Sequence, residues 1–138
     1  MKRNINNILN KFSNQKGLKI IMKNYLITGA AGFIGENFLK YILKKYENIK
    51  VIVGDLLTYA GNLGIIKEEL KDNRVKFEKV DIRDRKEIER IFSENKVDYV
   101  VNFAAESHVD RSIENPQIFL ETNILGTQNL IVIVYGEA

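Results

Sequence analysis

The stretch that most constrains this chain is residues 23–35, which read KNYLITGAAGFIG. An apolar run stops at Thr28, and three glycines then follow at a spacing of three. This pattern predicts a buried strand that turns tightly into a helix where a phosphate rests against the backbone. Gly29 would permit the turn, Gly32 would let a diphosphate approach without a Cβ in the way, and Gly35 would let the helix pack close to the strand. The N–H groups at the start of the helix would attract the anion.

An acidic residue after the second predicted strand favours a nucleotide ligand. A glycine triplet alone is also compatible with a strand-to-helix turn that binds nothing. Here, however, the apolar residues 51–54 end at Asp55, twenty residues after Gly35. A carboxylate at this position accepts hydrogen bonds from both ribose hydroxyls of a dinucleotide and repels a 2′-phosphate. The sequence therefore predicts a site for NAD rather than for NADP.

Strand and helix patterns alternate from residue 23 onward. This alternation predicts an α/β fold, a Rossmann-like doubly wound parallel sheet that is truncated after about four strands. The first helix has an apolar stripe that runs from Phe38 to Tyr46, and we expect it to close at Asn48. Such a stripe is typical of a surface helix that packs on a sheet, so it belongs to the core and not to a ligand site.

Three later features complete the predicted secondary structure. Asp84 and Glu87 match the N-cap and third positions of a capping box, which predicts a helix start. Residues 98–103 are largely apolar in succession, which predicts a strand that is buried on both faces. Pro116 has the position of a first helical residue, and we expect a long helix from there to about Ile131.

Polar side chains follow the third and fourth predicted strands. The third strand ends at Asp81 and Ile82, which could hold an adenine by its amino group and its face, although Asp81 could also simply cap a turn. After the fourth strand, Ala104 and Ala105 would allow a close approach of ligand to backbone. The polar residues 106–112 then lie at the carboxyl edge of a central strand, where ligands bind to open parallel sheets.

The 138 residues are enough for about one domain. We expect residues 1–21 to be a basic amphipathic or disordered extension and residues 22–138 to be a partial NAD-binding domain. Six of the 21 basic residues lie within the first 24 positions, which contain no acid. The net charge of +3 therefore belongs to this tail, and we expect no nucleic-acid partner.

Several residue types are absent or rare, and each absence excludes a class of function. Without cysteine there are no disulfides or thiolates, and with no signal peptide pattern we expect a cytoplasmic protein. No continuous apolar run approaches the roughly 18 residues that span a bilayer, so no membrane partner is expected. A single histidine without clustered acids predicts no metal site.

Four motifs together resemble one enzyme family. GAAGFIG, DLLTYAGNL, AAESHVDRS and ETNILGT closely resemble the amino-terminal part of dTDP-glucose 4,6-dehydratases, which are extended short-chain dehydrogenases/reductases. The resemblance covers about residues 22–130. The TYAGNL and AAESHVDRS motifs are specific to this enzyme, whereas the first motif is shared with nucleotide-sugar epimerases and decarboxylases.

The resemblance implies a set of NAD contacts along the chain. The backbone of Phe33 and Ile34 would lie at the pyrophosphate, and Ser107 would face both the cofactor and the sugar substrate. Leu56 departs from the pattern, because the family usually has a lysine there. Besides the three glycines, the implied cofactor residues are Phe33, Ile34, Asp55, Leu56, Leu57, Thr58, Asp81, Ile82, Phe103, Ala104, Ala105, Glu106, Ser107 and Thr122.

The resemblance also implies a reaction that this chain does not complete. In the family, bound NAD takes a hydride from C4 of dTDP-glucose, water is eliminated across C5 and C6, and the hydride returns to C6 to give dTDP-4-keto-6-deoxyglucose in deoxysugar biosynthesis. The tyrosine-lysine pair and the Thr-Asp-Glu group that do this work lie beyond the long helix, so no catalytic residue is assigned here.

Two residue pairs and one histidine resemble catalytic groups, but we do not expect them to act in catalysis. Tyr41 with Lys45, and Tyr46 with Lys50, both match Y-x-x-x-K, but both lie on the first helix or at its exit. His108 is expected to be a structural loop residue and not a general base.

Three functional hypotheses remain open. The first is the NAD-binding portion of a dTDP-glucose 4,6-dehydratase, inactive alone and able to form a homodimer through the helix after Pro116. The second is a stand-alone or vestigial nucleotide-binding protein, and the third is a fragment of a related epimerase or decarboxylase. The β-branched residues 131–138 depart from the Ala- and Leu-rich helix of the family, which suggests a truncated or frameshifted reading.

Overall fold

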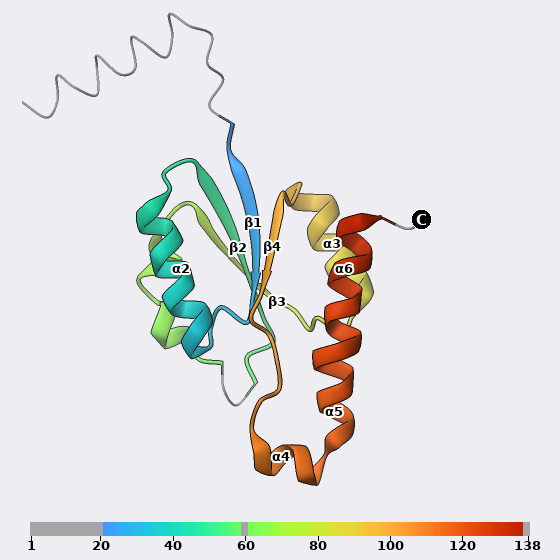
Figure 1. Ribbon diagram of the computed structural model, residues 1–138. Coiled ribbons are helices and arrows are strands. Elements are labelled where there is room, and N and C mark those ends of the chain that lie inside the picture. The colour runs from blue at the N-terminus through green and yellow to red at the C-terminus, as the bar shows by residue number, and fades with distance from the viewer. Residues whose placement is uncertain (1–20, 59–60, 137–138) are drawn as a thin grey trace, which may run out of the picture.

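The computed structural model describes residues 21–58 and 61–136, and Figure 1 shows its arrangement. Four parallel strands form one sheet in the order β3-β2-β1-β4. The strands are β1 (Lys23–Thr28), β2 (Ile49–Asp55), β3 (Val75–Lys79) and β4 (Tyr99–Asn102). The helices are α2 (Phe33–Lys45), the 3₁₀ turns η1 (Leu63–Ile66) and η2 (Glu69–Lys71), α3 (Arg85–Asn95), α4 (Val109–Glu114), α5 (Pro116–Leu120), the π-helical η3 (Glu121–Gly126) and α6 (Thr127–Tyr135). Residues 1–20 of the expected extension, the loop residues 59–60 and the last residues 137–138 lie outside the described residues.

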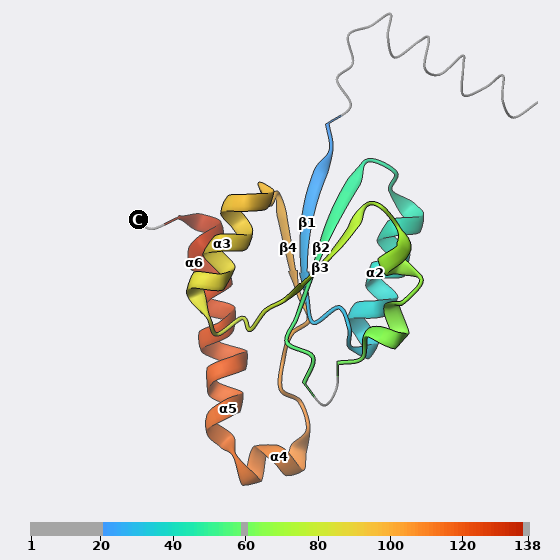
Figure 2. The same cartoon turned by 180° about the vertical axis from the view of Figure 1, so that it is seen from behind.

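Helices cover both faces of the sheet, as Figures 1 and 2 show from opposite sides. Successive side chains of a strand point to opposite faces. Ile27 of β1 therefore packs into one buried cluster with α2, while its neighbour Leu26 packs into a second cluster with α3 and α6. This two-sided core confirms the predicted doubly wound α/β arrangement.

Strand β4 is less buried than its sequence predicts. Tyr99 is 46% exposed, and Asn102 is also exposed. Within the described residues β4 pairs only with β1, so it is an edge strand and not a central one. The prediction of burial on both faces is wrong because an apolar run does not reveal whether a further strand covers it.

Helix α2 ends earlier than the apolar stripe predicts. Its last residue is Lys45, and Tyr46 adopts an extended conformation and is 42% exposed. The guanidinium of Arg74 lies at this end, where it donates hydrogen bonds to the carbonyls of Leu43 (3.1 Å) and Tyr46 (2.7 Å). Asp72 holds Arg74 in place through an ion pair of 2.7 Å. A cation at the helix carboxyl terminus satisfies the orphan carbonyls, and this cap replaces the expected closure at Asn48.

We expect Arg74→Ala to lower the free energy of unfolding by about 1–2 kcal/mol, because it removes both carbonyl contacts. Hydrogen bonding to Arg74 lowers the pKa of Asp72. The stability that the Asp72–Arg74 pair contributes is therefore complete above the ordinary aspartate pKa of about 3.9 and is lost as the pH falls below it. Urea unfolding at a series of pH values measures both effects. Lys71→Ala is the control, since its ion pair with Glu68 is exposed and should contribute less than about 0.5 kcal/mol. Equal losses in the two variants would contradict the capping role.

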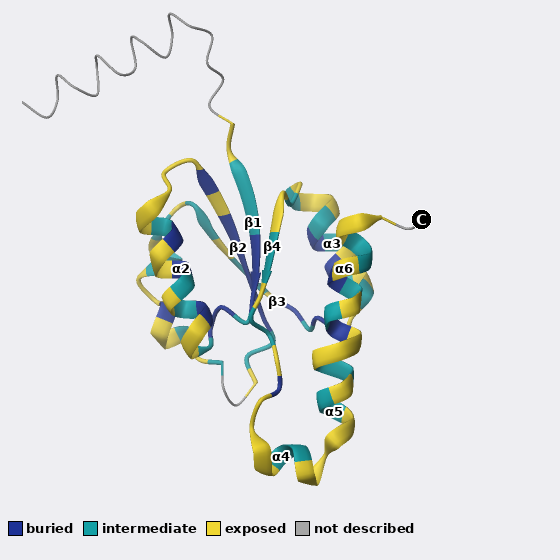
Figure 3. Cartoon of the chain, viewed as in Figure 1, coloured by how far each residue is buried: buried dark blue, intermediate teal, exposed yellow. Residues whose placement is uncertain are grey.

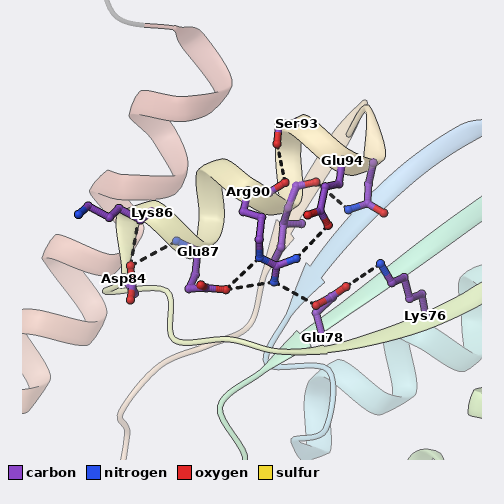
Figure 4. A network of polar contacts seen from close by, with 10 residues as sticks. Lys76, Glu78, Asp84, Lys86, Glu87, Arg90, Ser93 and Glu94 are labelled. Atoms are coloured by element: carbon purple, nitrogen blue, oxygen red, sulfur yellow. Dashed lines mark hydrogen bonds and ion pairs between the residues drawn. The ribbon is translucent and has the colours of Figure 1, made fainter.

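Helix α3 begins at the predicted N-cap but without the full capping box. The Asp84 carboxylate accepts hydrogen bonds from the N–H groups of Lys86 (3.1 Å) and Glu87 (3.3 Å). The Glu87 carboxylate does not complete the box, because it accepts hydrogen bonds from Arg90 instead. Figure 4 shows that Arg90 also reaches Glu78, which lies on β3 beside β2, so this network ties α3 to β3.

The chain after β4 is more helical than predicted. Residues 109–112 of the predicted polar segment 106–112 belong to α4, and the helix from Pro116 continues through η3 and α6 to Tyr135 rather than ending near Ile131. Residues 131–135 of the β-branched tail therefore extend this helix. The outer face of this helix is widely exposed, as Figure 3 shows in yellow. Its exposed apolar side chains are Leu120, Ile124, Leu125, Ile131, Val134 and Tyr135.

The helix from Pro116 to Tyr135 is long and apolar enough to cross a membrane by length and composition, although it contains no continuous apolar run of that length. It has 20 residues and a mean hydropathy of 1.3 over an 18-residue window, and 11% of that window is buried. Polar residues scattered along the helix lower this mean, but the apolar residues between them keep it at 1.3. Length and composition alone are weak evidence for a span, because the core helix of a globular protein passes the same test.

Candidate functional site

The glycine-rich turn between β1 and α2 has the geometry that its spacing predicts. Gly29 has a φ of +69°, and a Cβ there would lie 2.4 Å from the backbone nitrogen of Ala104. A Cβ on Gly35 would lie 2.3 Å from the carbonyl oxygen of Gly29. Gly29 thus permits both the turn and the approach of β4, and Gly35 lets α2 pack against the turn itself. Both contacts are with backbone, so neither position has room for a side chain.

Gly32 differs from the other two glycines because it has space. The nearest atom to a Cβ there would be the Gly29 carbonyl oxygen at 3.4 Å, and Gly32 lines a cavity. Gly32 is also the N-cap of α2, and no side chain caps the helix there. Phe33 and Ile34 follow with side chains that are 81% and 67% exposed. Gly32 therefore brings the start of α2 to the cavity, and no side-chain acceptor caps the first-turn N–H groups, as an anion site requires.

Asp55 lies at the end of β2, next to the glycine-rich turn. It is 8% exposed, and its carboxylate accepts hydrogen bonds from the N–H groups of Ala31 (3.0 Å) and Leu57 (2.8 Å). Leu57 has a φ of +57°, the left-handed conformation that turns its N–H back toward Asp55. An ionised carboxylate has about four acceptor positions, so about two remain for ribose hydroxyls.

The loop after Asp55 is bound back onto the glycine-rich turn. The N–H of Asn62 donates to the carbonyl of Ala31 at 3.1 Å, and Gly61 donates to Thr58 at 3.0 Å. Leu56, Thr58 and Gly61 line the cavity, whereas the Leu57 side chain packs against the core cluster on the α2 face. The described residues of this loop and the turn therefore lie in one wall of the cavity, with Asp55 between them.

Asp81 lies in the cavity wall after β3 and caps a turn, which is one of its two predicted roles. Its carboxylate accepts a hydrogen bond from the N–H of Arg83 (2.9 Å), which is the turn-capping arrangement, and it also lines the cavity. Burial acts to raise the pKa of Asp81, but the hydrogen bonds and charge of Arg83 outweigh it and lower the pKa. Asp81 is therefore ionised at neutral pH. Ile82, which is 4% exposed, lies beside it in the wall.

The segment after β4 forms the remaining wall, and α6 and η3 hold it. The Asn102 side-chain oxygen accepts from the Thr28 hydroxyl and the Ala104 N–H, and its amide donates to Thr127 at 3.3 Å. Glu106 is held more tightly. Its N–H donates to the Asn123 side chain (2.8 Å), and its carbonyl accepts from the same side chain (2.9 Å). The π-helical stretch η3 thus positions the backbone of Glu106 next to the cavity, a role typical of π-bulges at functional sites.

The structure brings most of the predicted site residues to one cavity of about 120 Å³ at the carboxyl ends of the strands. Five of the predicted residues do not line this cavity. They are Phe33, Ile34, Leu57, the exposed Ser107, and Gly35, which lies beneath the turn. The predicted residues that line it are Gly29, Gly32, Asp55, Leu56, Thr58, Asp81, Ile82, Phe103, Ala104, Ala105, Glu106 and Thr122.

Five further residues line the cavity and were not predicted. They are Gly54, Gly61, Val80, Arg83 and Ile118. Gly54 and Val80 directly precede predicted acids, and Gly61 lies within the DLLTYAGNL motif. Their neighbours in the sequence could therefore have predicted their place at the cavity. Arg83 follows Asp81 by two residues, the spacing of a side-chain-capped turn. Ile118 has no such signal, because its place depends on how the long helix packs.

The Y-x-x-x-K matches lie away from this cavity. The Lys45 ammonium donates to the Tyr41 hydroxyl at 2.7 Å on the solvent side of α2, and Tyr41 is 54% exposed. Lys50 is exposed on β2, and His108 is an exposed residue at the start of α4. Within residues 21–58 and 61–136, no group of three or more histidine, aspartate or glutamate side chains could hold a metal ion.

Comparison with known proteins agrees with this geometry. A family model described as GDP-mannose 4,6 dehydratase matches residues 26–136. The dTDP-glucose 4,6-dehydratase of Neisseria meningitidis serogroup B is 47% identical over 110 residues, which cover 80% of this chain and 31% of that protein. The enzyme of the same name from Salmonella typhimurium is 50% identical over 106 residues, with 77% and 29% covered. The chain thus spans about a third of the length of the curated relatives it matches.

Solved structures extend the likeness to the fold. The dTDP-glucose 4,6-dehydratase from Streptomyces venezuelae, with NAD and TYD bound, gives a TM-score of 0.74 at 43% identity, covering 80% of this chain and 35% of that one. The UDP-Glc/GlcNAc 4-epimerase from Campylobacter jejuni gives a TM-score of 0.73 at 31% identity, covering 82% and 33%. The two structures match the backbone of this chain about equally well, but the dehydratase has the higher sequence identity to it.

Proposed function

The chain belongs to the protein family described as GDP-mannose 4,6 dehydratase, and we propose that it is the NAD-binding, amino-terminal portion of a dTDP-glucose 4,6-dehydratase. One observation supports NAD binding above the others. The Asp55 carboxylate is fixed by the Ala31 N–H, so the acid that would bind ribose and the turn that would bind diphosphate form a single unit. Dehydratase relatives match at higher identity than the epimerases do, which favours the dehydratase over the epimerase alternative.

The described residues suit NAD from one end of the cavity to the other. The uncapped start of α2 with Gly32 would hold the diphosphate, Asp55 and Thr58 the adenosine ribose, and Asp81 with Ile82 the adenine. The backbone from Phe103 to Glu106, with Thr122, would line the nicotinamide side, and Ser107 would meet the sugar substrate. NAD would supply the hydride acceptor, a chemistry that no side chain provides.

Turnover is proposed to need residues that follow this portion in the relatives. The cavity of about 120 Å³ is smaller than the roughly 300–1,000 Å³ of typical small-molecule sites, so further walls are needed to enclose a dinucleotide and a nucleotide sugar. We therefore propose that the chain binds NAD but does not convert dTDP-glucose by itself.

A complementation assay tests whether the chain needs the remaining part of the enzyme for turnover. The chain is mixed with the remaining two-thirds of a dehydratase relative, and the 4-keto-6-deoxy sugar is measured. Restored activity supports the dehydratase assignment, and an epimer as product supports the alternative enzyme. Failure of restoration together with intact NAD binding favours a stand-alone nucleotide-binding protein.

We further propose that the helix from Pro116 to Tyr135 forms a homodimer and not a membrane span, in a cytoplasmic protein. Leu120, Ile124 and Ile131 are each more than half exposed and recur at helical spacing on its outer face. The family model includes this helix, and its buried Leu130 packs with α3. Burial against a second copy would remove this apolar surface from water without lipid.

We expect Ile124→Glu to shift the chain from dimer to monomer, because a charge would be buried in the contact. Light scattering after size-exclusion chromatography measures the molar mass. Lys40→Glu on the outside of α2 is the control and should leave the mass unchanged. The same mass for Ile124→Glu and the unaltered chain would contradict the proposed interface.

A further inference from the structure

Arg83 is held between two acids at the edge of the proposed cofactor cavity. It donates to the Asp81 carboxylate through its backbone N–H (2.9 Å), its Nε (3.0 and 2.9 Å to the two oxygens) and its Nη2 (2.6 Å). Its Nη1 reaches the carboxylate of Glu121 at 3.3 Å. Gln117 in turn donates to the other oxygen of Glu121 at 3.0 Å. These contacts link the exit of β3 to the helix that carries Thr122.

The same two segments are also held together by contacts between side chains and backbone. A Cβ on Gly126 would lie 2.6 Å from Ile82, so the helix packs directly on the residue between Asp81 and Arg83. The Asn129 side chain donates to the carbonyls of Ile82 and Arg83, each at 3.0 Å. Asp81 and Arg83 line both the cavity and a shallower groove beside the start of α3. The Asp81–Arg83–Glu121 chain is therefore a wall between the two.

Arg83 leaves Asp81 with a limited and oriented capacity to accept hydrogen bonds. An ionised carboxylate has about four acceptor positions, and three N–H groups of Arg83 are directed at this one. About one position remains for a ligand in the cavity. The planar guanidinium holds the carboxylate in a fixed orientation, which a flexible ammonium or a neutral side chain would not do.

We propose that Arg83 is a positioning residue that makes the proposed NAD site select bases with an exocyclic amino group. This inference rests on the proposed function. With its orientation fixed, Asp81 accepts a hydrogen bond from the 6-amino group of adenine. A base with a keto oxygen at that position places an acceptor against an acceptor. Glu121 assists by holding the outer end of the guanidinium.

The test compares NAD with nicotinamide hypoxanthine dinucleotide, which differs by this amino-to-keto change. Calorimetric titration of the full chain should show that NAD binds at least about tenfold more tightly, as expected for the loss of one charged hydrogen bond. In Arg83→Gln the ratio should fall to about threefold or less. Glu121→Gln should lower the ratio by about twofold while leaving the Arg83 pair with Asp81. Arg85→Gln, which removes a nearby cation that pairs with Glu89, should keep the unaltered ratio.

A purely structural role for Arg83 would weaken both dinucleotides alike and leave the ratio unchanged, which would overturn the proposal. A ratio near one in the unaltered chain, or a higher ratio in Arg83→Gln, would overturn it as well. If Arg83→Gln does not fold in a thermal melt, the Glu121→Gln ratio decides. Absence of NAD binding to the unaltered chain would reject the proposed function itself, whereas intact NAD binding with an unchanged ratio rejects only the role of Arg83.

Discussion

Gly29→Ala is expected to lower the free energy of unfolding by about 3 kcal/mol or more. A left-handed residue with a Cβ costs about 1–2 kcal/mol, and Gly29 has a φ of +69°. The Cβ would also lie 2.4 Å from the Ala104 nitrogen and 2.5 Å from the Phe103 carbonyl carbon, so β1 and β4 must separate. Overpacking of this kind costs about 1–3 kcal/mol further. Urea unfolding followed by circular dichroism measures the loss.

Gly32→Ala is the matched control, because it adds the same methyl group three residues later. Its nearest neighbour would be 3.4 Å away, which is ordinary contact, so stability should change by less than about 0.5 kcal/mol. The methyl group would instead occupy the place of a bound diphosphate and weaken NAD binding by about tenfold or more. The two glycines should thus separate folding from binding. Equal destabilisation by both variants would contradict the different roles assigned to them.

Asp55→Ala is expected to weaken NAD binding about 100-fold and to lower the free energy of unfolding by about 2–4 kcal/mol. The first effect is the loss of two hydrogen bonds from ribose hydroxyls to a charged acceptor. The second arises because the N–H groups of Ala31 and Leu57 lose their acceptor, and the Ala31 contact is buried. Calorimetry with NAD and urea unfolding give the two quantities independently.

Asp55→Asn distinguishes the charge of this side chain from its shape. The amide keeps one acceptor oxygen, so its stability should lie between that of the unaltered chain and that of Asp55→Ala. The repulsion of a 2′-phosphate is lost, so the preference for NAD over NADP should collapse. An Asp55→Asn variant that keeps the full preference would show that another group excludes NADP.

Features that depend only on residues close together in the sequence were predicted correctly. The turn at Gly29, the strand that ends at Asp55 and the N-cap at Asp84 each follow from backbone geometry within a few residues, and all three are present. The cavity follows from the same logic, because parallel strands end at one edge of a sheet and bring their exits together.

Features that depend on distant segments were missed. Helix α2 ends at Lys45 because Arg74, which is far along the chain, caps it. Strand β4 is exposed because no further strand pairs with it among the described residues, which its own apolar sequence cannot reveal. Ile118 reaches the cavity only through the packing of the long helix against the exit of β3.

The central claim is that a diphosphate and a ribose bind between the uncapped start of α2 and Asp55. Titration of the full chain with NAD and, separately, with NADP tests it most directly. The account predicts saturable binding of NAD at one site per chain and at least about tenfold weaker binding of NADP. No binding of NAD, or equal binding of the two dinucleotides, would contradict it.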